Sequence, residues 1–269
     1  MKMLIRDDDR NVQIEALVQG EGPDVVLIAS ALRGAEDFAQ VQSALTAAGY
    51  RSLALNMRGA GRSAGPDEGL TLSDVADDVA LVIVRECAGP AHVVGHALGN
   101  IIARATASYR PEVVKSVVVM PGGGQSLDRH PTPPHVLHHF ARCHDRSLSD
   151  AERLESLQIA FFAPGNDARS WLDGWWPAAR PVSRAAQMAD PEDWWRAGEA
   201  PMLIIHPLDD AFAPRAASLE TARALGERAV YVEAPNCGHA ILPEAPDLIA
   251  DHLVRFFRAQ DAPPNSPGH

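Results

Sequence analysis

The chain has 269 residues, 46% of them hydrophobic, which is enough for the core of one α/β domain with a modest insertion. Its formal net charge of −11 argues against nucleic acid or an anionic membrane as a partner, and its three scattered cysteines provide neither a disulfide framework nor a structural zinc site. Since no signal-peptide stretch or apolar run of membrane-spanning length is apparent, we expect a cytoplasmic protein, either a monomer or a homodimer.

Short β-branched runs alternate along the chain with helical patterns, which is typical of a mostly parallel sheet with crossover helices. The first two runs predict an antiparallel hairpin, and the later ones predict strands that are covered on both faces. The predicted strands cover residues 2–6, 11–18, 24–30, 51–56, 91–95, 113–120, 201–206 and 230–233. The predicted helices cover residues 71–89, 98–109, 214–226 and 246–260.

This alternation stops in the middle of the chain, after the glycine run at residues 122–124. The segment that follows is rich in His, Trp, Pro and Phe and shows helical periodicity only in pieces. A structureless loop of that length would be improbable in a compact domain. We therefore predict a helical cap over residues 125–198, inserted into a core formed by residues 1–124 and 199–260, with a disordered tail at 261–269.

The segment Gly95-His-Ala-Leu-Gly99 stands where a predicted strand runs into a predicted helix. Small residues two before and two after the central position are what a nucleophile elbow requires, because its strained turn brings strand and helix close together. The simpler alternative is a strand-to-helix turn with two convenient glycines. If this is an elbow, Ala97 occupies the nucleophile position, and its methyl group cannot attack a carbonyl carbon.

Two more polar residues follow predicted strands further along the chain. Asp210 comes after the strand at 201–206, and His239 lies between the last strand and the last helix. The order of nucleophile position, acid and histidine is the one found in α/β enzymes with a catalytic triad. Taken singly, Asp210 could cap a helix and His239 could be a surface loop residue, but their joint placement predicts a catalytic pair.

Together these segments resemble the α/β-hydrolase superfamily over nearly the full length of the chain. The stretch NMRGAGRSAGP at residues 56–66 is similar to the family's Asp-x-Arg-Gly-x-Gly-x-Ser segment, with Asn56 in place of the usual Asp. The resemblance implies a mostly parallel central sheet flanked by helices with a helical cap. It also implies that Asp210 is the triad acid and that His239 is the general base.

The loop at residues 29–34 departs from the family pattern, because it lacks the usual His-Gly after the third strand. Main-chain donors need no particular side chain, so the N–H groups of Ala31 and Leu98 are still expected to form an oxyanion hole. Whether Ala97 is native or an engineered replacement of serine stays open at this point. In both cases, Asp210 and His239 remain a competent general-base dyad.

Three functions are compatible with these residues. The first is hydrolysis of a small ester, lactone or activated C–C bond. The second is a non-hydrolytic reaction that uses the same base, catalysed by a lyase, a decarboxylase or a cofactor-independent oxygenase. The third is a catalytically inactive ligand-binding protein.

The remaining candidates concern the substrate pocket. His96 and Ser30 are expected to contact the substrate, with a catalytic role as the alternative for each. The cap aromatics expected to do so are Phe162, Trp175 and Trp176, with packing inside the cap as their alternative, and they favour an apolar or aromatic small molecule. His135 and His139 have the i, i+4 spacing of zinc ligands, but no carboxylate pattern accompanies them, so we expect neither a metal nor a cofactor.

Overall fold

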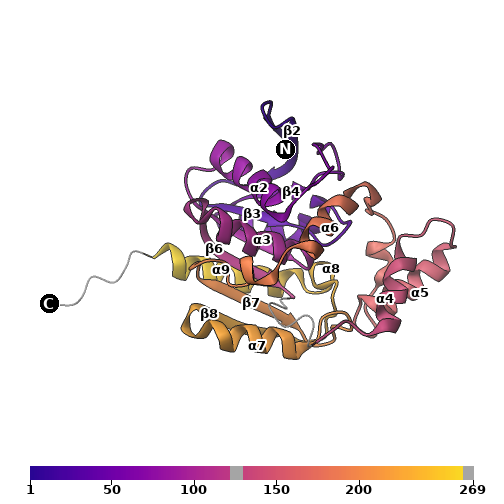
Figure 1. Cartoon of the computed structure of the whole chain (residues 1–269). Coiled ribbons are helices and arrows are strands. Elements are labelled where there is room, and N and C mark those ends of the chain that lie inside the picture. Colours follow the sequence, from indigo (N-terminus) through magenta and orange to yellow (C-terminus); the bar gives the residue numbers. More distant parts are fainter. Residues whose placement is uncertain (122–129, 263–269) are drawn as a thin grey trace.

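The computed structural model describes residues 1–121 and 130–262, and their central feature is an eight-stranded sheet (Figure 1). Its strand order is β1-β2-β4-β3-β5-β6-β7-β8. The strands are β1 (Lys2–Asp7), β2 (Val12–Gln19), β3 (Asp24–Ile28), β4 (Arg51–Asn56), β5 (Ala91–His96), β6 (Val114–Met120), β7 (Met202–Pro207) and β8 (Ala229–Ala234). The β1–β2 and β2–β4 pairs are antiparallel, and all the other neighbours are parallel. The predicted hairpin and mostly parallel sheet are confirmed.

Helices cover both faces of this sheet, as its buried strands require. The α-helices of the described residues are α1 (Ala39–Ala47), α2 (Leu72–Glu86), α3 (Leu98–Tyr109), α4 (Pro134–Cys143), α5 (Asp150–Ala160), α6 (Arg180–Met188), α7 (Arg215–Leu225), α8 (Ile241–Glu244) and α9 (Pro246–Asp261), of which α4 and α5 lie away from the sheet (Figure 1). Strand β3 shows the two layers, because Val26 and Ile28 pack with α2 and α3 whereas Val25 and Leu27 pack with α1 and α9. Consecutive side chains of a strand point to opposite faces, so a continuous apolar run serves both layers.

Local sequence signals account for some helix boundaries and fail for others. Helix α2 begins with a capping box, in which Thr71 Oγ1 accepts from Asp74 N (3.2 Å) and Asp74 Oδ2 accepts from Thr71 N (2.9 Å). Helix α1 is absent from the predicted helices, because in its short AQVQSALTA sequence the apolar spacing is carried only by Val41 and Leu45.

Between β6 and β7 the described chain forms α4, α5 and α6, with short 3₁₀ turns between α5 and α6 and after α6. Helices α4 and α5 pack together at the right of Figure 1, away from the sheet, whereas α6 contacts α2 and α3. The first residues of the predicted cap, 125–129, and residues 263–269 of the predicted tail lie outside the described residues. Asp261, assigned to that tail, is the last residue of α9.

The end of α9 is anchored to the sheet by a buried polar cluster. The Asp261 carboxylate accepts from Tyr50 OH (3.1 Å) and contacts His92 Nε2 at 3.2 Å, while His92 Nδ1 lies 2.7 Å from Ser116 Oγ. Burial lowers the pKa of His92 to about 4, so the ring is neutral at pH 7. Among the described helices, none has the length and apolar character needed to cross a bilayer.

Candidate active site

The junction between β5 and α3 has the strained geometry of an elbow. Ala97 has φ 50° and ψ −108°, and its N–H donates to the Met120 carbonyl oxygen at 2.6 Å. A Cβ atom on Gly95 would lie 2.1 Å from the Gly99 oxygen, and one on Gly99 would lie 2.1 Å from the Ile28 oxygen. The two glycines are therefore required by close backbone approach, as the elbow interpretation predicts.

Asp210 and His239 come together beside this elbow, because β7 and β8 are adjacent parallel strands whose carboxyl ends lie at one edge of the sheet. His239 Nδ1 lies 3.2 and 3.1 Å from the two carboxylate oxygens of Asp210. Asp210 Oδ1 also accepts from the backbone N–H groups of Phe212 (2.7 Å) and Ala213 (2.8 Å). Since a carboxylate can only accept, the contact with Asp210 requires a proton on His239 Nδ1, and Nε2 is then the ring nitrogen at which a base would act.

His96 supports this pair from beneath. Its ring is fully buried, and burial lowers its pKa to about 3, so it is neutral and its Nε2–H donates to the His239 carbonyl oxygen at 2.7 Å. The His96 ring centroid lies 5.6 Å from that of His239 and 5.9 Å from that of Trp171. The structure thus places His96 against the backbone of His239 and the wall of the site.

The predicted main-chain donors, Ala31 and Leu98, lie in the loop after β3 and at the start of α3. Arg33 N donates to Ser30 O (3.1 Å) across a tight turn in which Leu32 has φ 60°. The N–H groups of Ala31 and Leu98 donate to no other residue in the described ranges 1–121 and 130–262. The N–H of Leu98 also lies in the first turn of α3, where the helix dipole favours negative charge.

Arg33 ties this loop to the segment between β6 and β7. Its guanidinium makes two hydrogen bonds to Asp37, at 2.6 and 2.9 Å, and donates to the Asp173 carbonyl oxygen at 2.6 Å. Its Cζ atom lies 4.7 Å from the ring centroid of Trp171 and 4.8 Å from that of Trp175. Sequence reasoning missed Arg33, because its partners at Trp171, Asp173 and Trp175 are far along the chain.

A buried cavity of about 10 Å³, roughly the space of one water molecule, lies next to the elbow. Ser30, a predicted contact residue, lines it. Leu98, which was predicted as a backbone donor, also lines it. The other lining residues were not predicted as site residues: Ala29, Leu32, Arg33, Leu55, Met57, Ile102, Ala179 and Val182. They come from several strands and helices, so no local pattern marks them as a group.

The predicted cap aromatics lie in a packed cluster and do not line this cavity. Phe162 and Trp175 are buried in it and Trp176 packs against it. Trp175 Nε1 donates to the Trp171 carbonyl oxygen at 2.7 Å, and Trp176 N donates to that of Leu32 at 2.7 Å. The rings beside His239 include two that were not predicted as site residues: Phe212 at 4.8 Å and Phe161 at 5.4 Å between centroids. Phe212 follows Asp210 by two residues, which is the signal that could have found it.

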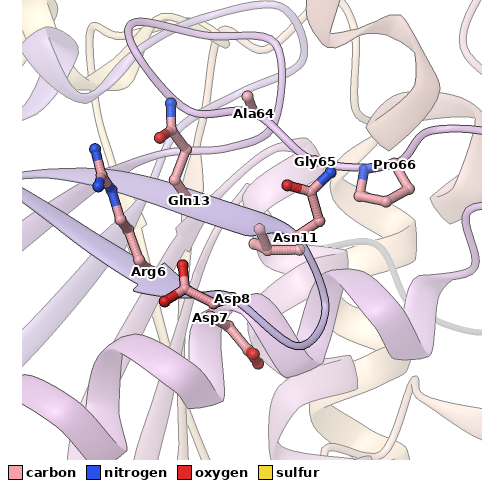
Figure 2. A pocket seen from close by; sticks show the side chains of 9 residues that line it. Arg6, Asp7, Asp8, Asn11, Gln13, Ala64, Gly65 and Pro66 are labelled. Carbon is pink, nitrogen blue, oxygen red and sulfur yellow. The ribbon is translucent and has the colours of Figure 1, made fainter.

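Three larger hollows of the described part of the chain lie elsewhere on the surface, and neither Asp210 nor His239 lines any of them. Figure 2 shows one of about 760 Å³ between the β1–β2 hairpin and residues 64–66, lined mainly by polar side chains such as Arg6, Asp8 and Gln13. The second, of about 900 Å³, runs between residues 67–73 and α6, and the third, of about 410 Å³, lies between α1 and α9. None of the three has catalytic groups in a suitable arrangement, so the elbow remains the candidate site.

Cys237 and the histidines of α4 do not add catalytic groups. Burial raises the pKa of the Cys237 thiol to about 12, so it is not an activated nucleophile. His139 Nδ1 contacts Ser156 Oγ at 3.1 Å, and His135 is exposed. Within residues 1–121 and 130–262, no group of three or more His, Cys, Asp or Glu side chains is arranged to hold a metal ion.

Comparison with known proteins gives a consistent result. The family model described as "Alpha/beta hydrolase family" matches residues 14–252. A non-heme haloperoxidase of Rhodococcus erythropolis is 28% identical over 228 residues, covering 78% of this chain and 83% of the relative. A protein of Rhizobium rhizogenes named as carbamate hydrolase RutD is 25% identical over 256 residues, covering 87% and 93%. Another so named, from Variovorax paradoxus, is 35% identical over 128 residues, covering 47% and 44%.

Solved structures show the same fold. An esterase of Exiguobacterium antarcticum superposes with a TM-score of 0.77 at 17% identity, covering 96% of this chain and 100% of the other. A protein of Mycobacterium tuberculosis named as non-heme bromoperoxidase BpoC gives 0.75 at 24% identity, covering 94% and 97%.

Proposed function

Because the chain belongs to the alpha/beta hydrolase family, we propose that it hydrolyses a small ester, lactone, carbamate or activated C–C bond with water, not serine, as the attacking nucleophile. The observation that carries this proposal is the Asp210–His239 pair, hydrogen bonded at 3.1 Å beside an elbow that holds Ala97. A base is present and oriented, whereas the side chain that would form an acyl-enzyme is replaced by a methyl group.

In the proposed reaction, His239 Nε2 removes a proton from a water molecule while the water oxygen forms a bond to the substrate carbonyl carbon. The carbonyl oxygen gains negative charge, which the N–H groups of Ala31 and Leu98 stabilise. The Asp210 carboxylate stabilises the His239 imidazolium during this step. The bond to the leaving group then breaks, and the imidazolium returns the proton to that group.

This mechanism favours substrates with a reactive carbonyl or a good leaving group, because no covalent intermediate divides the barrier into two smaller ones. A positioned general base contributes about 10²- to 10⁴-fold in rate. The relatives named as carbamate hydrolases support the inclusion of carbamates in the substrate class. We further propose that the segment 125–198 acts as a cap, since Trp171, Asp173 and Trp176 contact the loop that carries Ala31.

The test compares four proteins on p-nitrophenyl esters, a lactone and a p-nitrophenyl carbamate: wild type, His239→Gln, Ala97→Ser, and exposed His135→Gln as the matched control. We expect turnover without a burst of p-nitrophenol in wild type and in His135→Gln, and a loss of at least about 100-fold in His239→Gln. Ala97→Ser is expected to show a burst, because it restores a group that can be acylated. Equal rates for wild type and His239→Gln would refute the base role, and turnover by Ala97→Ser alone would refute water attack.

A second candidate is proton abstraction from carbon without hydrolysis, as in a lyase. The observation that favours it is the apolar surroundings of His239, whose side chain is 4% exposed and packs against the stacked rings of Phe161 and Phe212. A base shielded from water suits an acidic C–H group. Reaction in ¹⁸O-labelled water separates the two, because only hydrolysis places the label in the product.

A further inference from the structure

The carboxylate of Glu244 receives three hydrogen bonds from two separate parts of the chain. Its Oε2 atom accepts from Gly238 N at 2.7 Å, directly beside His239. Its Oε1 atom accepts from Ala163 N and from Asn166 Nδ2, both at 2.7 Å. Glu244 therefore joins the loop that carries His239, residues 236–240, to the turn at residues 161–166.

Other contacts join the same two segments. Ala240 N donates to the Phe161 carbonyl oxygen at 2.8 Å, and Asn166 Nδ2 also donates to the Asn236 carbonyl oxygen at 2.9 Å. A Cβ atom on Gly238 would lie 2.6 Å from the Phe161 oxygen, so the two backbones touch at this point. The residues on both sides of His239 are thus attached to the 161–166 turn.

We propose that Glu244 is a positioning residue that sets the place of the His239 imidazole relative to Asp210 and the elbow. Hydrogen bonds from N–H groups to an ionised carboxylate are shorter and stronger than neutral ones. The Glu244 contacts therefore restrain the 236–240 loop more firmly than the single backbone bond from Ala240 N to the Phe161 oxygen would. Any shift of Gly238 moves the adjacent His239, whose Nδ1 must stay near 3.1 Å from Asp210. The inference rests on the proposed function only in naming His239 as the base.

The three donors explain why a carboxylate is needed here. Burial raises the pKa of Glu244, and the donors from Asn166, Ala163 and Gly238 oppose this effect. A glutamine can accept at one terminal atom only, so its NH₂ group would face either the Gly238 N–H or the pair at Ala163 and Asn166. An aspartate is one methylene shorter and cannot reach both segments. A neutral or shorter side chain at 244 therefore releases one side of the connection.

The experiment follows the His239 imidazole by NMR in wild type, Glu244→Gln and the exposed Glu227→Gln as control, all well below their melting temperatures. In wild type and the control we expect a downfield resonance from the Nδ1 proton shared with Asp210. In Glu244→Gln this proton is expected to exchange with water at least about tenfold faster, or to broaden beyond detection, because the loop opens more often. An unchanged resonance and exchange rate in folded Glu244→Gln would overturn the proposal.

Asn166→Ala provides a second variant if Glu244→Gln does not fold. It removes the bonds to Glu244 and to Asn236 but leaves Gly238 and Ala163 attached, so we expect a smaller acceleration in the same direction, and no acceleration would count against the proposal. These readouts need no substrate, so failure to detect hydrolysis leaves them intact. If hydrolysis is found, Glu244→Gln should lower kcat by about tenfold or more with little change in KM, as misplacement of a base predicts.

Discussion

Replacing Asn56 by aspartate would test the buried polar cluster that supports the loop after β3. Asn56 is fully buried; its Oδ1 atom accepts from Ala35 N at 2.8 Å, and its Nδ2 atom donates to Glu15 Oε2 at 3.0 Å. Aspartate has the same shape and would keep the bond from Ala35. It would also put a second carboxylate oxygen where Nδ2 stands, about 3 Å from that of Glu15.

The loss of stability in Asn56→Asp is set by whichever of two responses costs less free energy: repulsion between the two carboxylates, or protonation of one of them. Two unit charges at 3 Å repel by about 5 kcal/mol at an effective dielectric constant of 20. Protonating one carboxyl at pH 7 costs about 4 kcal/mol, from about three pH units at 1.36 kcal/mol each. Protonation is the cheaper response, and the protonated carboxyl at position 56 can donate to Glu15 Oε2 in place of Asn56 Nδ2, which offsets part of the cost. We expect Asn56→Asp to lower the free energy of unfolding by about 2–4 kcal/mol at pH 7.

The pH dependence identifies the cause. A carboxyl group whose folded-state pKa is raised destabilises the fold above its unfolded pKa, and this penalty shrinks as pH falls toward that value. Urea unfolding at pH 7 and pH 5 should therefore show a penalty for Asn56→Asp, measured against wild type at each pH, that is smaller by about 2 kcal/mol at pH 5. Asn56→Ala, which adds no charge, should show no such difference. An equal penalty for Asn56→Asp at both pH values would refute the reasoning.

Three further changes test other parts of the structure. Since His92 is neutral in the fold with a pKa of about 4, the free energy of unfolding should fall by about 3 kcal/mol between pH 6.5 and 4, and His92→Gln should reduce this loss in urea titrations. Arg33→Met leaves Asp37 buried and unpaired and should lower the free energy of unfolding by about 3–5 kcal/mol. The double variant Arg33→Met/Asp37→Leu should recover more than half of this loss, and equal losses in the single and double variants would contradict the reasoning. Ala97→Gly should raise the free energy of unfolding by about 1 kcal/mol, because φ 50° favours glycine, and a decrease would contradict the assigned strain.

The mostly parallel sheet with its opening hairpin, and the meeting of Asp210 with His239, could be predicted because they depend on local patterns. Apolar runs such as residues 24–28 mark strands covered on both faces, and parallel strands bring the residues after their carboxyl ends to one edge. The two glycines around Ala97 predicted the elbow for a similar reason, since the close backbone approach there admits no side chain.

The rest depends on contacts between distant segments, which no local pattern records. Arg33 meets Asp173, and Glu244 meets Ala163, across long stretches of sequence. Trp175 illustrates the opposite difficulty, because an aromatic side chain in a predicted cap can face a substrate or pack inside the cap, and only the packing separates the two.

The elbow at Ala97 has a physical cost that its side chain does nothing to offset. A non-glycine residue held at φ 50° and ψ −108° costs about 1–3 kcal/mol, and a methyl group forms no bond with a substrate. What this geometry provides is a helix that begins abruptly at Leu98, with its first N–H groups and positive dipole end aimed beyond the edge of the sheet. Such a helix end stabilises an oxyanion whether the attacking oxygen comes from serine or from water. Under the proposed function, the elbow of this chain serves as a support for main-chain donors, with His239 as the base.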